Sequence, residues 1–257
     1  MTLKLSELDY FYGGRRLNFA HRGARLHAPE NTLPAFEKTL SLGIDGAELD
    51  VQLTTDGVVV VFHDQRLSRT SDGEGILTEK TLAELRELDA GYYFSQEYQG
   101  TKIPTLDEVF ELVGQKLLIN VELKSVSLTP SLAEAVDRVI KRHNMERRVL
   151  ISSFNPIQLR HARRVSPQIP RGFLHTTGNA AWLWKVRALA GDRVANHPDV
   201  ALVNEAYIVE AHRRDQAVNV WGVAEVSSVR RLCRLGVDMI VNDCPELVQK
   251  IFQEEAG

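Results

Sequence analysis

The chain has 257 residues, of which 44% are hydrophobic and 25% are charged, with 31 Lys and Arg against 34 Asp and Glu. This composition is typical of a globular protein that buries a large core, and it excludes an intrinsically disordered chain. A net charge of −3 gives no general attraction for nucleic acid or an anionic membrane, so we expect no nucleic-acid partner and expect any anion to be bound at a local site.

Neither the N-terminal segment nor the cysteine content indicates export. Residues 1–16 contain no apolar signal region, and no transmembrane segment is expected because no run of 18 apolar residues occurs. The two cysteines, Cys233 and Cys244, are too few for a disulfide framework and form no C-x-x-C pattern. We therefore expect a cytoplasmic protein, and the sequence leaves its oligomeric state open.

Short β-branched segments alternate with amphipathic segments along the whole chain. In chain order, strands are expected at residues 17–20, 46–53, 117–123, 149–152, 171–175, 200–203, 217–223 and 239–241, with a hairpin strand at 58–62. Helices are expected at residues 30–42, 106–113, 131–143, 156–164, 180–190, 205–215, 227–235 and 245–252.

Eight strand–helix pairs in a chain of this length predict one α/β domain, a (β/α)₈ TIM barrel that spans residues 1–257. A doubly wound open sheet is the alternative, although no glycine-rich dinucleotide-binding sequence follows the first strand. Residues 65–104 are too long for a strand–helix loop and predict a small insertion after the second strand, able to cap a substrate. Its aromatic residues 92–94 could cover the substrate or pack the insertion onto the barrel.

Polar residues occur at the ends of the predicted strands, where barrel enzymes carry their reactive groups. These residues are His21, Arg22, Glu48, Asp50, His63, Asp64, Glu122, Lys124, Trp221, Asn242 and Asp243.

Three of these residues are candidate metal ligands. Glu48 and Asp50 are two positions apart on a strand, so their carboxylates share one face, and Glu122 on the neighbouring strand can converge with them. Three crowded carboxylates need a cation to stay ionised, and oxygen ligands favour Mg²⁺ or Ca²⁺ over zinc. The alternative is a structural network in which the carboxylates pair with Lys124 and Arg22.

Two histidines are candidates for proton transfer. His21 and His63 lie at the same end of neighbouring strands, and imidazole is the side chain best suited to move a proton near neutral pH. Arg22 and Lys124 supply positive charge that can hold a phosphate. Together with a cation, these groups predict phosphoryl transfer or phosphodiester cleavage.

Several segments together resemble the glycerophosphodiester phosphodiesterase family, and the resemblance covers nearly the whole chain. The segments are FAHRG at 19–23, PENT at 29–32, ELDV at 48–51, FHD at 62–64, LSRT at 67–70, IPTL at 103–106, VELK at 121–124, VW at 220–221 and GVD at 236–238. Two segments depart from the family pattern: residues 222–224 are Gly-Val-Ala rather than Thr-Val-Asn, and residues 242–243 are Asn-Asp rather than Thr-Asp. Both flank the predicted pocket, so they affect the expected substrate rather than the expected chemistry.

The resemblance implies a metal-dependent enzyme that hydrolyses glycerophosphodiesters to glycerol 3-phosphate and an alcohol. It implies His21 and His63 as the acid/base pair, and a divalent cation held by Glu48, Asp50 and Glu122. It also implies that Arg22, Lys124 and Trp221 bind the substrate.

Two other functions remain open. The first is a phospholipase-like phosphodiesterase for larger (lyso)lipids, which would use Trp182, Trp184 and the aromatic residues 92–94 at a lipid surface. The second is a catalytically weak module that binds phosphorylated polyols. Glu30 and Asn31 are expected either to begin a helix or to support Arg22.

Overall fold

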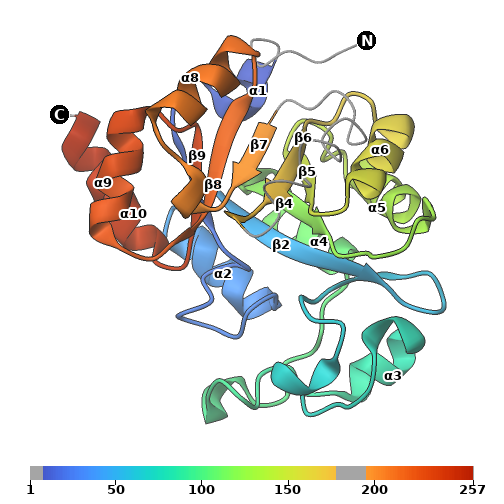
Figure 1. The fold of residues 1–257 in the computed structure, drawn as a ribbon. Helices are drawn as coiled ribbons and strands as arrows, with labels where there is room; N and C mark the ends of the chain where they lie inside the picture. Colours follow the sequence, from blue (N-terminus) through green and yellow to red (C-terminus); the bar gives the residue numbers. More distant parts are fainter. Residues whose placement is uncertain (1–7, 178–194, 257) are drawn as a thin grey trace.

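The computed structural model describes residues 8–177 and 195–256, and within them eight parallel strands form a closed barrel (Figure 1). The strands are β1 (Leu17–Ala20), β2 (Gly46–Leu53), β4 (Leu118–Leu123), β5 (Val149–Ser153), β6 (Arg171–His175), β7 (Ala195–Pro198), β8 (Ala217–Val223) and β9 (Met239–Asn242). A short strand, β3 (Val59–Val61), pairs antiparallel with β2 outside the ring. The predicted TIM barrel is confirmed, and the open-sheet alternative is wrong, because β1 pairs with both β2 and β9.

Helices surround the barrel and connect successive strands. They are α2 (Leu33–Ser41), α4 (Leu106–Val113), α5 (Ser131–Arg142), α6 (Pro156–Val165), α8 (Glu205–Arg213), α9 (Val226–Leu235) and α10 (Pro245–Ala256). The helix expected at residues 180–190, with Trp182 and Trp184, lies outside the described residues. No helix in the described ranges is long and apolar enough to cross a membrane.

Successive side chains along each strand point alternately outward, into a core between strands and helices, and inward, into the barrel interior. Outward residues such as Leu49 and Val121 pack with Phe110 and Val136 of the surrounding helices. Inward residues near the strand starts form a second apolar cluster, which includes Phe11 of α1 (Asp9–Tyr12) at that end of the barrel. The inward positions near the strand ends are polar, and this change of character places the candidate site at the carboxyl end.

The strand predicted at residues 200–203 is wrong. The sixth of the eight barrel strands is β7 (Ala195–Pro198), and the next segment is a 3₁₀ helix, η7 (Val200–Leu202). β7 lacks an apolar run because His197 points into the barrel, where its Nε2 lies 2.9 Å from the side-chain nitrogen of Asn219. Burial lowers the pKa of His197 to about 3, so this ring is neutral and packs in the interior of the barrel.

Residues 65–104 form a small lobe that lies beside the end of β2 in Figure 1, and its apolar side chains form a cluster with Val60 of β3 and Phe62. The lobe contains α3 (Leu82–Glu87) and the 3₁₀ helices η2 (Leu67–Arg69), η3 (Leu77–Glu79) and η4 (Gln96–Tyr98), and a further 3₁₀ turn, η5 (Gly114–Lys116), follows α4. The Tyr98 hydroxyl donates a 3.0 Å hydrogen bond to the carbonyl of His27, and the Tyr93 hydroxyl accepts one of 3.1 Å from the backbone of Glu30. Tyr93 therefore attaches the lobe to the loop after β1, while a capping role for the lobe stays a prediction.

Candidate active site

Inward positions at the carboxyl ends of neighbouring strands bring the predicted site residues together. β2 and β4 are parallel neighbours in a register that pairs Asp50 with Glu122 and Glu48 with Asn120. Since side chains two residues apart share a face, Glu48 and Asp50 point into the barrel on β2, and Glu122 and Lys124 follow the same face on β4.

Glu48, Asp50 and Glu122 form a buried acidic triad. Each contributes a carboxylate oxygen, and these three oxygens lie within 4.8 Å of one another. Burial, followed by the negative charges of Asp50 and Glu122, raises the pKa of Glu48 well above its ordinary value. Burial and the charge of Asp50 likewise raise the pKa of Glu122 to about 7. The triad is therefore short of positive charge.

The donor set of this triad fits a hard divalent cation. Three carboxylates supply oxygen ligands alone, which suits Mg²⁺ or Ca²⁺ and does not suit a thiol-preferring ion. A bound cation would also offset the repulsion that raises the pKa values of Glu48 and Glu122. The ammonium of Lys124 supplies part of this charge, at 3.0 Å from Glu122 and 3.8 Å from Asp50.

Arg22 lies beside the triad in a left-handed backbone conformation, with φ of 55°. This turn directs its backbone N–H to Glu48, at 3.0 Å, while its guanidinium donates to Glu30 at 2.7 Å and lies 3.4 Å from Asp50. The following Gly23 also has positive φ, and a Cβ there would lie 2.8 Å from the Cβ of Ala35. The loop after β1 can therefore pack against α2 only with glycine at this position.

The His21 ring adjoins the triad on the side of Glu48. Its Nδ1 lies 2.7 Å from the carboxylate of Asp243, directly after β9, and its Nε2 lies 3.9 Å from Glu48. Asp243 therefore orients the ring, so that Nε2 is the nitrogen nearer the triad.

The His63 ring adjoins the triad on the side of Lys124. Its Nδ1 lies 2.5 Å from the carboxylate of Asp64, and its Nε2 lies 3.2 Å from the Lys124 ammonium. Burial lowers the pKa of His63, and the nearby cations Arg22 and Lys124 add to this effect against the opposing charge of Asp50.

Arg69, from the lobe, binds both the carboxylate beside His63 and the carboxylate beside Arg22. Its guanidinium donates to Asp64, the partner of His63, and to Glu30 at 2.7 Å, the partner of Arg22. Glu30 thus accepts from two arginines, and their hydrogen bonds and charges outweigh its burial and hold its pKa at about 2. Glu30 therefore supports Arg22, as one of the two sequence-based expectations had it, and the α2 helix begins later, at Leu33.

Trp221, on β8, lies near the site through its contact with Phe154, and its predicted role in substrate binding stays a prediction. Its indole N–H donates a 2.9 Å hydrogen bond to the carbonyl of His197, and its ring meets Phe154 edge-on, with centroids 5.7 Å apart. The indole orientation is thus set by the neighbouring strand, which leaves an aromatic wall near Lys124.

Three supporting residues, Asp64, Arg69 and Asp243, had no role assigned from the sequence, and Asn31, expected to begin a helix or to support Arg22, supports Asp50 through its side chain. Asn31 donates a 2.8 Å hydrogen bond to Asp50, while Asp64, Arg69 and Asp243 hold the two histidine rings as described above. Asp64 and Asp243 could have been suspected because each stands at a strand end beside a polar residue. Arg69 gave no such signal, since it follows no strand and one of its partners, Glu30, is 39 residues away.

Comparison with known proteins identifies related chains. The sequence profile described as "Glycerophosphoryl diester phosphodiesterase family" matches residues 21–247. A glycerophosphodiester phosphodiesterase of Caldanaerobacter subterraneus is 40% identical over 93% of this chain and 99% of its own, and one of Bacillus altitudinis is 36% identical over 92% and 98%. Among solved structures, an Oleispira antarctica phosphodiesterase in complex with the product sn-glycerol-3-phosphate is 33% identical, with a TM-score of 0.87, over 94% of this chain and 98% of that one.

Proposed function

The chain belongs to the glycerophosphodiester phosphodiesterase family, and we propose that it hydrolyses glycerophosphodiesters to glycerol 3-phosphate and an alcohol in a metal-dependent reaction. The family membership makes the protein a phosphoric diester hydrolase. The Oleispira relative, which binds sn-glycerol-3-phosphate as its product, supports the same product here. The proposal includes residues 1–257 as one catalytic domain, with residues 65–104 as an insertion that covers the substrate.

One observation carries the proposed mechanism. Both imidazoles adjoin the acidic triad, and each has its Nδ1 beside a carboxylate: Asp243 for His21 and Asp64 for His63. This arrangement turns the Nε2 atom of His21 toward the triad and holds the Nε2 atom of His63 at 3.2 Å from the Lys124 ammonium, which borders the triad. A site for binding alone needs no such pair of oriented proton carriers.

The proton transfers balance across one displacement at phosphorus. One histidine accepts the proton of the attacking oxygen as its bond to phosphorus forms, and the other donates a proton to the alcohol oxygen as the bond to phosphorus breaks. The attacking oxygen belongs to water, or to the adjacent glycerol hydroxyl, in which case a cyclic phosphate forms first and water then opens it. Arg22 and Lys124 orient the phosphate through its charged oxygens.

Glu48, Asp50 and Glu122 would hold the divalent cation, Mg²⁺ or Ca²⁺. When bound, the cation supplies positive charge beside the phosphate oxygens and lets all three carboxylates stay ionised.

The test is hydrolysis of a small panel of glycerophosphodiesters by the wild type and by variants of the two histidines. We expect His21→Ala and His63→Ala each to lower kcat by about two to four orders of magnitude, the usual contribution of general acid–base catalysis. Chelator should abolish activity, and Mg²⁺ or Ca²⁺ should restore it. Near-full activity of either variant would remove that histidine from the mechanism, and a fully active metal-stripped enzyme would remove the cation.

A further inference from the structure

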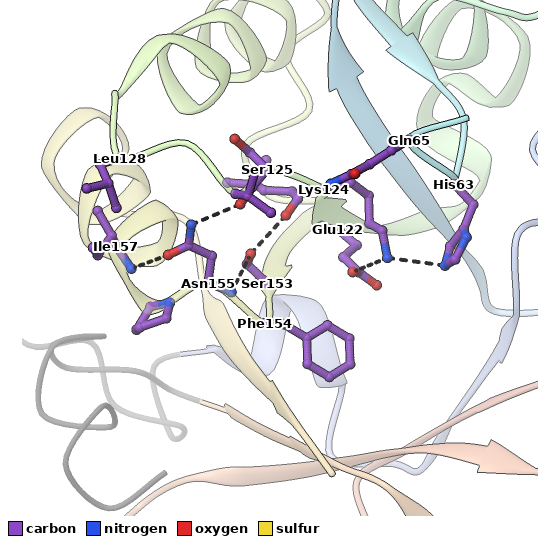
Figure 2. Close-up of a pocket in the computed structure, with 13 residues that line it drawn as sticks. His63, Gln65, Glu122, Lys124, Ser125, Leu128, Ser153, Phe154, Asn155 and Ile157 are labelled. Carbon is purple, nitrogen blue, oxygen red and sulfur yellow. Dashed lines mark hydrogen bonds and ion pairs between the residues drawn. The ribbon is translucent and has the colours of Figure 1, made fainter. Parts of the chain in front are cut away.

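A cavity of about 530 Å³ opens directly beside the acidic triad (Figure 2). His63, Glu122 and Lys124 line one end of it, and the rest lies between the segment after β4 and the turn from β5 into α6. We infer that this cavity receives the departing alcohol of the substrate and selects an uncharged, apolar alcohol. The inference rests on the proposed hydrolysis of glycerophosphodiesters and names the class of diester that the site prefers.

The wall of the cavity away from the triad is apolar and partly open to solvent. Val126, Leu128 and Phe154 line it, and they are three of the seven large hydrophobic side chains that are exposed within the described residues. Val126 is 81% exposed and Leu128 is 68% exposed. Exposed apolar side chains gathered at the mouth of a cavity mark a binding surface, because a ligand there removes them from water.

Among the described residues that line the cavity, the charged side chains all lie at the end beside the triad. Glu122 already pairs with Lys124 and belongs to the triad, so no free carboxylate in this lining can balance a choline or ethanolamine group. The Lys124 ammonium also lies 6.0 Å from the centre of the Phe154 ring and occupies the aromatic face nearest the triad. A choline or ethanolamine cation at the apolar end would therefore lie beyond the triad, beside no negatively charged side chain of the described lining.

Two polar side chains of the wall, those of Ser153 and Asn155, are bound to backbone groups and hold the wall in place. The Asn155 amide donates to the carbonyl of Ser125 at 2.9 Å and accepts from the N–H of Ile157 at 3.0 Å. The Ser153 hydroxyl donates to the carbonyl of Leu123 at 2.8 Å, and Figure 2 shows these bonds linking the two segments. The cavity is therefore preformed, with Asn155 and Ser153 already engaged.

These features assign the two halves of a glycerophosphodiester to different places. Glycerol carries two hydroxyl groups that need polar partners, which the triad region supplies and the wall around Leu128 does not. The other substituent on phosphorus then extends along the apolar wall. Each methylene buried there should raise kcat/KM by about two- to fourfold until the chain leaves the cavity.

The experiment measures kcat/KM for glycerophosphodiesters of straight-chain alcohols from methanol to octanol. Two further substrates are glycerophosphocholine and its uncharged isostere, the 3,3-dimethylbutyl ester. We expect kcat/KM to rise with chain length, and KM to be lower for the dimethylbutyl ester than for the choline ester. Equal values along the series, or a lower KM for choline, would overturn the inference. If the wild type cleaved none of these diesters, the proposed function itself would fail.

Variants of the wall test the assignment to these residues. Leu128→Ser should flatten the dependence on chain length, and Val126→Ser, at the more exposed position, provides the same test if the first variant folds poorly. Val209→Ser is the matched control, since Val209 is 61% exposed on α8 and does not line the cavity; it should leave the series unchanged. If both wall variants kept the full slope, the cavity would not hold the alcohol.

A 1-acyl lysophospholipid, which carries its hydrocarbon on glycerol, is the final substrate. If kcat/KM rose with the length of its acyl chain while kcat/KM of the alkyl esters did not change with chain length, the assignment of the cavity to the departing alcohol would be wrong.

Discussion

Replacing Glu122 by glutamine should stabilise the metal-free protein at neutral pH. Burial and the charge of Asp50 raise the pKa of Glu122 from its ordinary 4.5 to about 7. Below pH 4.5 this carboxyl is protonated in both the folded and the unfolded chain. As pH rises from 4.5 through 7, the unfolded chain releases the proton more readily than the folded one, so the folded state loses stability over this window. Each pKa unit is worth about 1.4 kcal/mol, so the loss is about 3 kcal/mol at pH 8.

The variant cannot ionise at this position, so it should keep the stability that the wild type loses. In a chain of this size, about 3 kcal/mol corresponds to an increase in Tm of about 6–12 °C. The assay is thermal unfolding in chelator at pH 5 and pH 8, and the gap between Glu122→Gln and wild type should appear at the higher pH. Adding Mg²⁺ or Ca²⁺ should then raise the Tm of the wild type and leave the variant nearly unchanged, because only the wild type keeps the full ligand set.

A carboxylate outside the site provides a control in which the Glu→Gln change should lower, rather than raise, the stability at pH 8. Hydrogen bonds from Arg86 and from Thr105, at the start of α4, outweigh burial and lower the pKa of Glu108. Glu108→Gln should therefore be less stable than wild type at pH 8, since a lowered pKa contributes stability that is present above the ordinary value. If Glu122→Gln and wild type unfolded at the same temperature in chelator at both pH values, the reasoning about the triad would be refuted.

Two further predictions concern the support of the site and the barrel interior. Arg69→Ala removes a cation beside Asp64, so the negative charge of Asp64 should raise the pKa of His63. We expect kcat to fall about tenfold and the limb of the pH–rate profile that belongs to His63 to move to higher pH. An unchanged profile would show that Arg69 does not position Asp64 and His63. Gly172→Ala would place a Cβ 2.1 Å from the ring of His197, and this overpacking should cost about 1–3 kcal/mol in urea unfolding, so an unchanged midpoint would contradict the packing described here.

The barrel could be predicted from the sequence because most of its strands are buried on both faces and read as apolar runs. In β2 and β4 the signal is instead the period of two, in which buried outward residues such as Leu49 and Val121 alternate with inward polar residues such as Asp50. β7 could not be found in this way, since its interior position is filled by the polar His197, which needs the side chain of Asn219 from the next strand. The apolar run that followed it, at residues 200–203, was more strand-like and instead forms η7.

In the site, too, some features could be predicted from the sequence and others depend on the fold. Residue type and position at a strand end identify Glu48, Asp50 and Glu122 as a candidate triad, because the two-residue period alone places Glu48 and Asp50 on one face. Closure of the barrel decided what lies around them: the register that sets Asp50 beside Glu122, and the pairing of His21 with Asp243, 222 residues away. Local periodicity is a property of a few consecutive residues and can be read from the chain. Contacts between distant strands depend on how all eight close into one ring, and only the folded structure contains that information.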